Sequence, residues 1–130
     1  MTELTRAQEE ILRAIWDAEE AAVSDIQNLL PEPRPAYNTV ATVIKVLEKK
    51  GYVSHKTFGK TNVYYPIVSR REYAQNIMKT AAKGLFNGSF TQMASFFVKN
   101  KDVSLKQLEE LRSILDEEIR KQKNPKKQDS

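Results

Sequence analysis

Amide, hydroxyl and ammonium side chains recur at helical spacing in the middle of the chain, at Asn38, Thr42, Lys45 and Lys49. At about 100° per residue these positions share one face of a helix. Such groups can contact base edges and phosphate oxygens in the major groove of DNA. The face lacks arginine, so it cannot make the bidentate contact of arginine with guanine. We interpret it as a DNA-reading face, and an ordinary solvated helix face is the alternative.

Apolar residues of the same segment determine how that face is presented. They follow the i, i+3, i+4, i+7 spacing of a buried helical stripe, at Val40, Val43, Ile44 and Leu47. This spacing predicts a helix over residues 36–50 whose opposite face is exposed. We therefore expect four residues to read bases in the major groove or to position the helix there: Asn38, Thr39, Thr42 and Lys45. Tyr37 and Lys49 flank them.

Two helices and a hairpin are predicted around this segment. Ser or Thr followed three residues later by Gln marks the starts of two helices, at Thr5–Gln8 and Ser24–Gln27. Pro31 ends the second helix. Its residues Ile26, Leu29 and Leu30 are expected to face inward. β-branched and aromatic residues predict strands over 52–57 and 62–66. Three helices followed by a hairpin form the winged helix-turn-helix, whose third helix enters the major groove. We expect the basic wing to contact the DNA backbone through His55, Lys56, Lys60 and Thr61.

The C-terminal half is predicted to be helical. Further capping boxes begin helices at Ser69–Glu72, Ser89–Gln92 and Ser104–Gln107. Three helices in so short a segment bury little apolar surface alone, so we expect self-association, with docking onto the first domain as the alternative. The expected dimerisation residues are Phe90, Met93, Phe97, Leu105, Leu108, Leu111 and Leu115. The predicted fold is mainly α: a winged-helix DNA-binding domain over 1–72, a three-helix dimerisation domain over 73–121, and a disordered basic tail over 122–130.

Charge and composition limit the functions that the chain can have. The net charge is only +4, but residues 1–33 carry −6 and residues 34–72 carry +6, as expected of a surface directed at a polyanion. The chain has no cysteine and a single histidine, so thiol chemistry and multi-histidine metal sites are excluded. It has no apolar run of membrane-spanning length. We expect a cytoplasmic protein that is not an enzyme and holds no metal or cofactor.

Three segments of the sequence are similar to a known family. Residues 4–17, 37–44 and 47–52, which include Tyr37-Asn38-Thr39-Val40 and Lys49-Lys50-Gly51-Tyr52, resemble the penicillinase-repressor family of the BlaI/MecI type. The likeness covers about residues 3–121. It implies a winged-helix homodimer that represses promoters by binding a dyad operator through the third helix and the wing. It also implies that residues past Tyr73 form the dimerisation domain.

The same resemblance bears on regulation. In better-known members a membrane-embedded metalloprotease sensor triggers cleavage of an Asn–Phe bond, and the matching position here is Phe96–Phe97, with Phe96 in place of asparagine. Core packing is the alternative role for these two rings. The absence of cysteine excludes the copper-sensing branch. Val46 stands where arginine is frequent, so operator preference cannot be transferred.

The sequence therefore predicts a dimeric transcriptional repressor that binds duplex DNA and controls a resistance or stress-response gene. A metalloprotease sensor system is a candidate partner. One alternative is a winged-helix regulator that binds a small molecule beside the aromatic segment 86–97. Another is a winged helix that serves only as a protein-interaction module.

Overall fold

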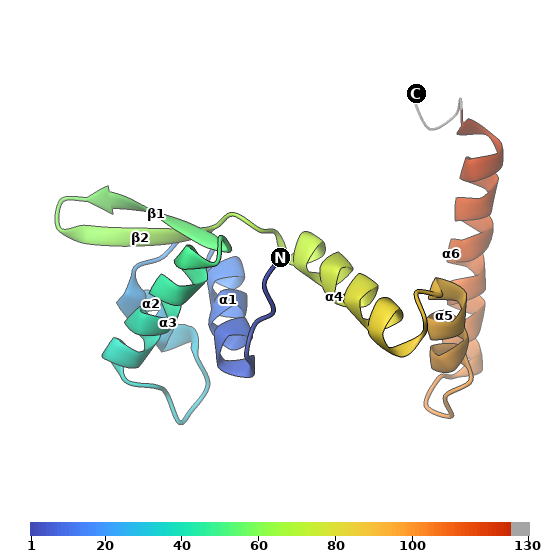
Figure 1. Ribbon diagram of the computed structural model, residues 1–130, viewed down its shortest axis with the longest axis horizontal. Coiled ribbons are helices and arrows are strands. Elements are labelled where there is room, and N and C mark those ends of the chain that lie inside the picture. Colours follow the sequence, from blue (N-terminus) through green and yellow to red (C-terminus); the bar gives the residue numbers. More distant parts are fainter. Residues whose placement is uncertain (126–130) are drawn as a thin grey trace. The chain divides into compact units, whose positions relative to one another are not determined.

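The computed structural model describes residues 1–125 and divides the chain into two compact units, Met1–Met78 and the part from Lys79 onward. The first unit contains three helices, a hairpin and the start of a fourth helix (Figure 1): α1 (Arg6–Ala18), α2 (Val23–Leu29), α3 (Tyr37–Lys49), β1 (Val53–Phe58), β2 (Thr61–Pro66) and the beginning of α4 (Arg70–Leu85). This mainly α arrangement with one small sheet confirms the predicted winged-helix fold. The domain boundary expected after residue 72 stays a prediction.

The core of the first unit is built where the three helices and the hairpin meet. α3 packs against both α1 and α2, and the fully buried side chains include Leu12, Ile15, Ile26, Ile44 and Leu47. Val43, also predicted to face inward, is half-buried against this cluster. Leu29 was expected inward as well, and this was wrong: it is exposed, whereas the next residue, Leu30, is buried.

Three of the five predicted capping boxes form completely, the box at Ser89–Gln92 forms only its Ser89 half, and the box at Ser24–Gln27 is absent. Thr5 and Gln8 form the reciprocal capping box of α1, in which each side chain accepts a hydrogen bond from the other residue's backbone N–H. Ser69–Glu72 and Ser104–Gln107 make the same two contacts at α4 and at α6 (Leu105–Lys123). The box expected at Ser24–Gln27 does not form. α2 starts one residue before Ser24, with Ala22 at the N-cap and no side-chain capping bond.

The hairpin is anchored at one end and free at the other. β1 and β2 pair antiparallel from Val53↔Pro66 to Phe58↔Thr61, and Ala21 adds an isolated bridge to Tyr64 through hydrogen bonds of 2.8 and 3.0 Å. Val53 and Tyr64 are buried, but the strand residues next to the turn are exposed. The turn therefore projects from a fixed base, as a wing does.

The second unit contains the later turns of α4, then α5 (Phe90–Val98) and α6 (Leu105–Lys123). Ser89 caps α5 by accepting a hydrogen bond from the backbone N–H of Gln92, 3.1 Å away. Ala82 and Met93 are its buried apolar residues among those described. The predicted disordered tail over 122–130 differs from the structure at its start, because α6 continues to Lys123; residues 126–130 lie outside the described part of the chain.

The first turn of α4 is fixed to the first unit by an aromatic cluster. The Trp16 indole N–H donates to the Val68 carbonyl at 2.9 Å, and the Tyr73 ring lies 5.6 Å from Trp16 and 5.9 Å from Tyr52 between centroids. The Tyr73 hydroxyl donates to Glu9 Oε2 at 2.7 Å. Burial, together with the Glu9 carboxylate, raises the pKa of Tyr73 far above 10.0.

This raised pKa predicts a loss of stability at alkaline pH. The folded state holds the phenolic proton more tightly than the unfolded state, so the stabilisation is complete below pH 10.0 and decreases as the pH rises above it. Tyr73→Phe should lower the free energy of unfolding by about 1–2 kcal/mol at neutral pH and should reduce the alkaline loss. Part of that loss should remain, because burial also raises the pKa of Tyr52.

Urea titrations followed by circular dichroism, at neutral pH and above pH 10.0, measure both effects. Tyr65→Phe in the wing is the matched control and should leave both unchanged. Equal stability of Tyr73→Phe and the wild type across this range would contradict the role of the Glu9 contact.

Candidate nucleic-acid interface

The buried stripe of α3 leaves its other face in solvent. Val40, Ile44 and Leu47 are fully buried. The residues expected to meet DNA are exposed on the remaining surface of the helix, at Tyr37, Asn38, Thr39, Thr42, Lys45 and Lys49. The structure therefore brings the helical part of the predicted site together on one element. Contact of these residues with DNA stays a prediction.

The Thr42 side chain makes one hydrogen bond within its own helix. Its hydroxyl donates to the carbonyl of Asn38, one turn earlier, at 2.8 Å. The donor is thus used, so the oxygen lone pairs and the methyl group are what the side chain can offer to a ligand. Those groups suit an amino group of adenine or cytosine and the methyl group of thymine.

The N-terminus of α3 is open. Ala36 occupies the N-cap and makes no side-chain hydrogen bond to the first turn. The first backbone N–H groups of a helix have no partner inside the helix, and together with the helix dipole they attract anions such as phosphate. Tyr37, the first helical residue, is 51% exposed beside them. The sequence signal for this uncapped start is the absence of Ser, Thr, Asp or Asn at position 36, and the predictions above did not include it.

Two of the four wing residues predicted to contact DNA are engaged inside the protein. His55 Nδ1 lies 2.5 Å from Glu48 Oε2, at the end of α3, and its ring lies 5.4 Å from that of Tyr64. Lys56 Nζ lies 3.9 Å from Glu20 Oε2 and 5.2 Å from the centre of the Tyr65 ring. These contacts join the wing to α3 and to the segment after α1, so both side chains also position the wing.

Lys60 and Thr61 lie at the free end of the hairpin. Both are exposed, and Gly59 before them has φ +62°, a left-handed conformation that glycine adopts without strain. Lys60, like Lys45 and Lys49 on α3, makes no ion pair within residues 1–125. These three ammonium groups are therefore the cations of the predicted site that are available to phosphate.

Arg70 has a structural role in the first unit. Its guanidinium donates to Asp17 Oδ1 at 2.7 Å and lies 5.3 Å from the Trp16 ring. Both contacts hold the start of α4 against the end of α1. The ion pair is exposed, and such pairs contribute about 0–1 kcal/mol.

Most of the residues predicted to form a dimer are exposed in the single chain. Within residues 1–125, α6 has no buried residue over its whole length, and Leu105, Leu111 and Leu115 lie in solvent. Phe90 and Phe97 of α5 are also exposed, Leu108 is half-buried, and Met93 is buried inside the unit.

Phe96 and Phe97 are 63% and 53% exposed, so they do not pack into the core of the single chain. Phe96 lies 5.7 Å from Phe86 and 6.0 Å from Phe97 between ring centres. These aromatic contacts leave most of both rings uncovered. The bond between the two residues is also inside α5.

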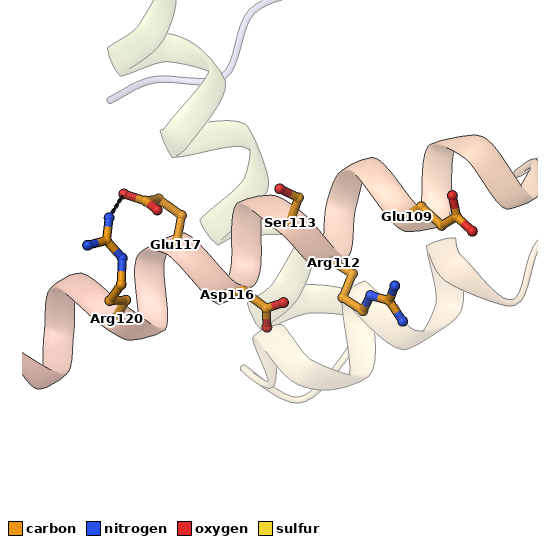
Figure 2. Close-up of a pocket in the computed structure, with 6 residues that line it drawn as sticks. All are labelled: Glu109, Arg112, Ser113, Asp116, Glu117 and Arg120. Carbon is orange, nitrogen blue, oxygen red and sulfur yellow. Dashed lines mark hydrogen bonds and ion pairs between the residues drawn. The ribbon is translucent and has the colours of Figure 1, made fainter.

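A different face of α6 is polar. An open pocket of about 350 Å³ lies along this helix. Figure 2 shows the residues that line it: Glu109, Arg112, Ser113, Asp116, Glu117 and Arg120. Glu117 and Arg120 form an ion pair at 2.5 Å. α6 is thus amphipathic, with charges on one side and exposed leucines and isoleucines on the other.

The three-helix core, the bridged hairpin and the exposed polar face of α3 define a winged-helix protein. The chain belongs to the penicillinase repressor family, whose model matches residues 4–117. It is 29% identical to the methicillin resistance regulatory protein MecI of Mammaliicoccus sciuri over 114 residues, which cover 87% of this chain and 93% of that protein. It is 26% identical to the penicillinase repressor of Bacillus licheniformis over 122 residues, or 93% of this chain and 95% of the relative.

Family membership confirms the resemblance inferred from the sequence. It supports a transcriptional repressor, a class that binds DNA and has no enzymatic activity, as predicted. Among residues 1–125, no helix is long and apolar enough to cross a bilayer.

Proposed function

We propose that two copies of this chain bind a dyad operator in duplex DNA and repress transcription by occupying the promoter. The observation that carries the proposal is the exposed face of α3, where Asn38, Thr42 and Lys45 lie opposite the buried stripe. The uncapped helix start and Lys49 add groups that suit phosphate. In this arrangement α3 reads the major groove and the wing contacts the adjacent backbone.

The exposed apolar residues of α6 support pairing of two chains. A long helix that buries none of its leucines within its own chain leaves a continuous apolar stripe in water, which is typical of an interaction surface. A second copy offers the same stripe, and a two-fold dimer presents two recognition helices to paired half-sites.

The relatives' names support a proposal about the kind of gene that this chain controls. They refer to methicillin resistance and to penicillinase, so we propose that this repressor acts in the cytoplasm on a gene for resistance to β-lactam antibiotics. A sensor protease that cleaves at Phe96–Phe97 is a proposed route to relief. Because that bond is inside α5, cleavage would require local unwinding of the helix.

Binding to duplex DNA as a function of salt tests the proposal. If about 6 phosphates are neutralised per subunit, the logarithm of the binding constant should fall with the logarithm of salt concentration at a slope of about −5. Lys60→Ala should reduce the magnitude of that slope by about 1, because one phosphate contact is removed. Fluorescence anisotropy of a labelled random duplex measures both slopes.

Lys106→Ala, which removes an exposed lysine from α6, is the matched control and should leave the slope unchanged. No binding even at low salt would refute DNA binding and favour a winged helix that serves as a protein-interaction module.

A further inference from the structure

One large apolar side chain at the wing has no role in the function proposed above. Phe58 is the last residue of β1 and is 58% exposed. It lies opposite Thr61 across the hairpin and directly before Gly59, next to the turn that joins β1 and β2. Covering this exposed aromatic ring with a partner would lower the free energy, because apolar surface is removed from water.

The strand register shows which way the ring points. Side chains alternate between the two faces of a strand, so Phe58 shares a face with Lys56, whereas Val53, His55 and Thr57 lie on the other. Val53 is buried and His55 contacts Glu48 of α3, so the face of Phe58 points away from the core. On the core-facing side, Thr57 Oγ1 donates to Asn62 Oδ1 at 2.9 Å and links the strands next to the turn.

The charge around Phe58 indicates the chemistry of the partner. No acidic residue occurs between Glu48 and Glu72, although this segment contains six lysines and arginines. Lys60, two residues after Phe58, is exposed and forms no ion pair in the described chain. A partner that meets an apolar ring and an adjacent ammonium group must offer apolar and anionic groups side by side. The sugar-phosphate backbone of DNA does so, since each deoxyribose lies between two phosphates.

We propose that the Phe58 ring packs against deoxyribose of the duplex bound by α3, while Lys60 contacts a neighbouring phosphate. This inference rests on the proposed function and adds an apolar contact to its electrostatic ones. The contact releases no counterion, so its contribution to affinity is independent of salt. It is also independent of base sequence, because every nucleotide carries the same sugar.

Anisotropy titrations of Phe58→Ala against a random duplex, over a range of salt concentrations, test the contact. We expect about tenfold weaker binding at every salt concentration, which corresponds to loss of most of the burial of one aromatic ring, and an unchanged salt slope. Phe58→Leu should recover part of the affinity. Ile67→Ala is the matched control, since it removes another exposed apolar side chain from the same unit and should leave binding unchanged.

A photo-crosslink keeps the inference testable if Phe58→Ala perturbs the hairpin. Benzoylphenylalanine in place of Phe58 should crosslink to the duplex, and the same group in place of Ile67 should not. Wild-type affinity of Phe58→Ala, a reduced salt slope in that variant, or no crosslink at position 58 would each overturn the contact while DNA binding stands. Absence of binding by the wild type would instead refute the proposed function itself.

Discussion

Leu111→Asp is expected to leave the protein as monomers of 14.9 kDa at concentrations where the proposed wild-type dimer has twice that mass. Leu111 is exposed on the apolar side of α6, so a single chain tolerates aspartate there. In the proposed dimer, two carboxylates would be buried without partners, which costs several kcal/mol. The dissociation constant should therefore rise by about a hundredfold or more.

Sedimentation equilibrium measures this change directly. Ser113→Asp is the matched control, because it introduces the same charge on the polar face of α6 (Figure 2). Its helical neighbours at i±3 and i±4 are all acidic (Glu109, Glu110, Asp116 and Glu117), and each like-charge pair should cost at most about 0.5 kcal/mol. A Leu111→Asp variant that still sediments as a dimer would refute the proposed interface.

Thr42→Ala combined with Lys45→Ala should abolish specific operator binding, because both changes fall on the exposed face of α3. The Thr42 substitution removes a hydroxyl whose oxygen is free to accept a hydrogen bond. The Lys45 substitution removes an ammonium group that forms no ion pair in the described chain. A good base contact contributes about 1–3 kcal/mol, and the loss occurs in both half-sites. Affinity for the operator should thus fall by about a thousandfold, toward the non-specific level.

An electrophoretic mobility shift with the natural operator, identified by sequencing DNA that copurifies with the protein, measures the loss. Thr91→Ala with Lys106→Ala removes the same two functional groups from exposed positions of the second unit and should bind as the wild type does. Dimer mass and helicity should be unchanged in both double variants. Full operator affinity after Thr42→Ala with Lys45→Ala would exclude this face as the reading surface.

The sequence predicted α3 well because its information is local. A buried stripe of Val40, Ile44 and Leu47 leaves only one side of the helix for Asn38, Thr42 and Lys45, whatever the rest of the chain does. The reciprocal caps at Thr5 and Ser104 are local as well, since both partners lie within one turn. Patterns of this range can be read without knowledge of the tertiary structure.

The errors arose where a distant residue decides the outcome. α2 begins before Ser24 because Ala21 is held in a bridge to Tyr64 of the wing, so the extended N-cap conformation falls on Ala22. The wing contacts of His55 and Lys56 also depend on how the hairpin meets α3 and the end of α1. Charge counting predicts only contact of both side chains with DNA, which stays a prediction; their additional contacts with Glu48 and Glu20 appear only in the tertiary structure.

Trp16 is the only tryptophan of the chain, and its indole lies where α1 meets the start of α4. Intrinsic tryptophan emission therefore reports on the first unit alone, whereas the far-ultraviolet dichroism of the helices sums over both units. Coincident midpoints of the two signals during unfolding indicate one cooperative transition, and separate midpoints indicate two. The protein thus carries an optical label with which the unfolding of its first unit can be distinguished from that of the whole chain.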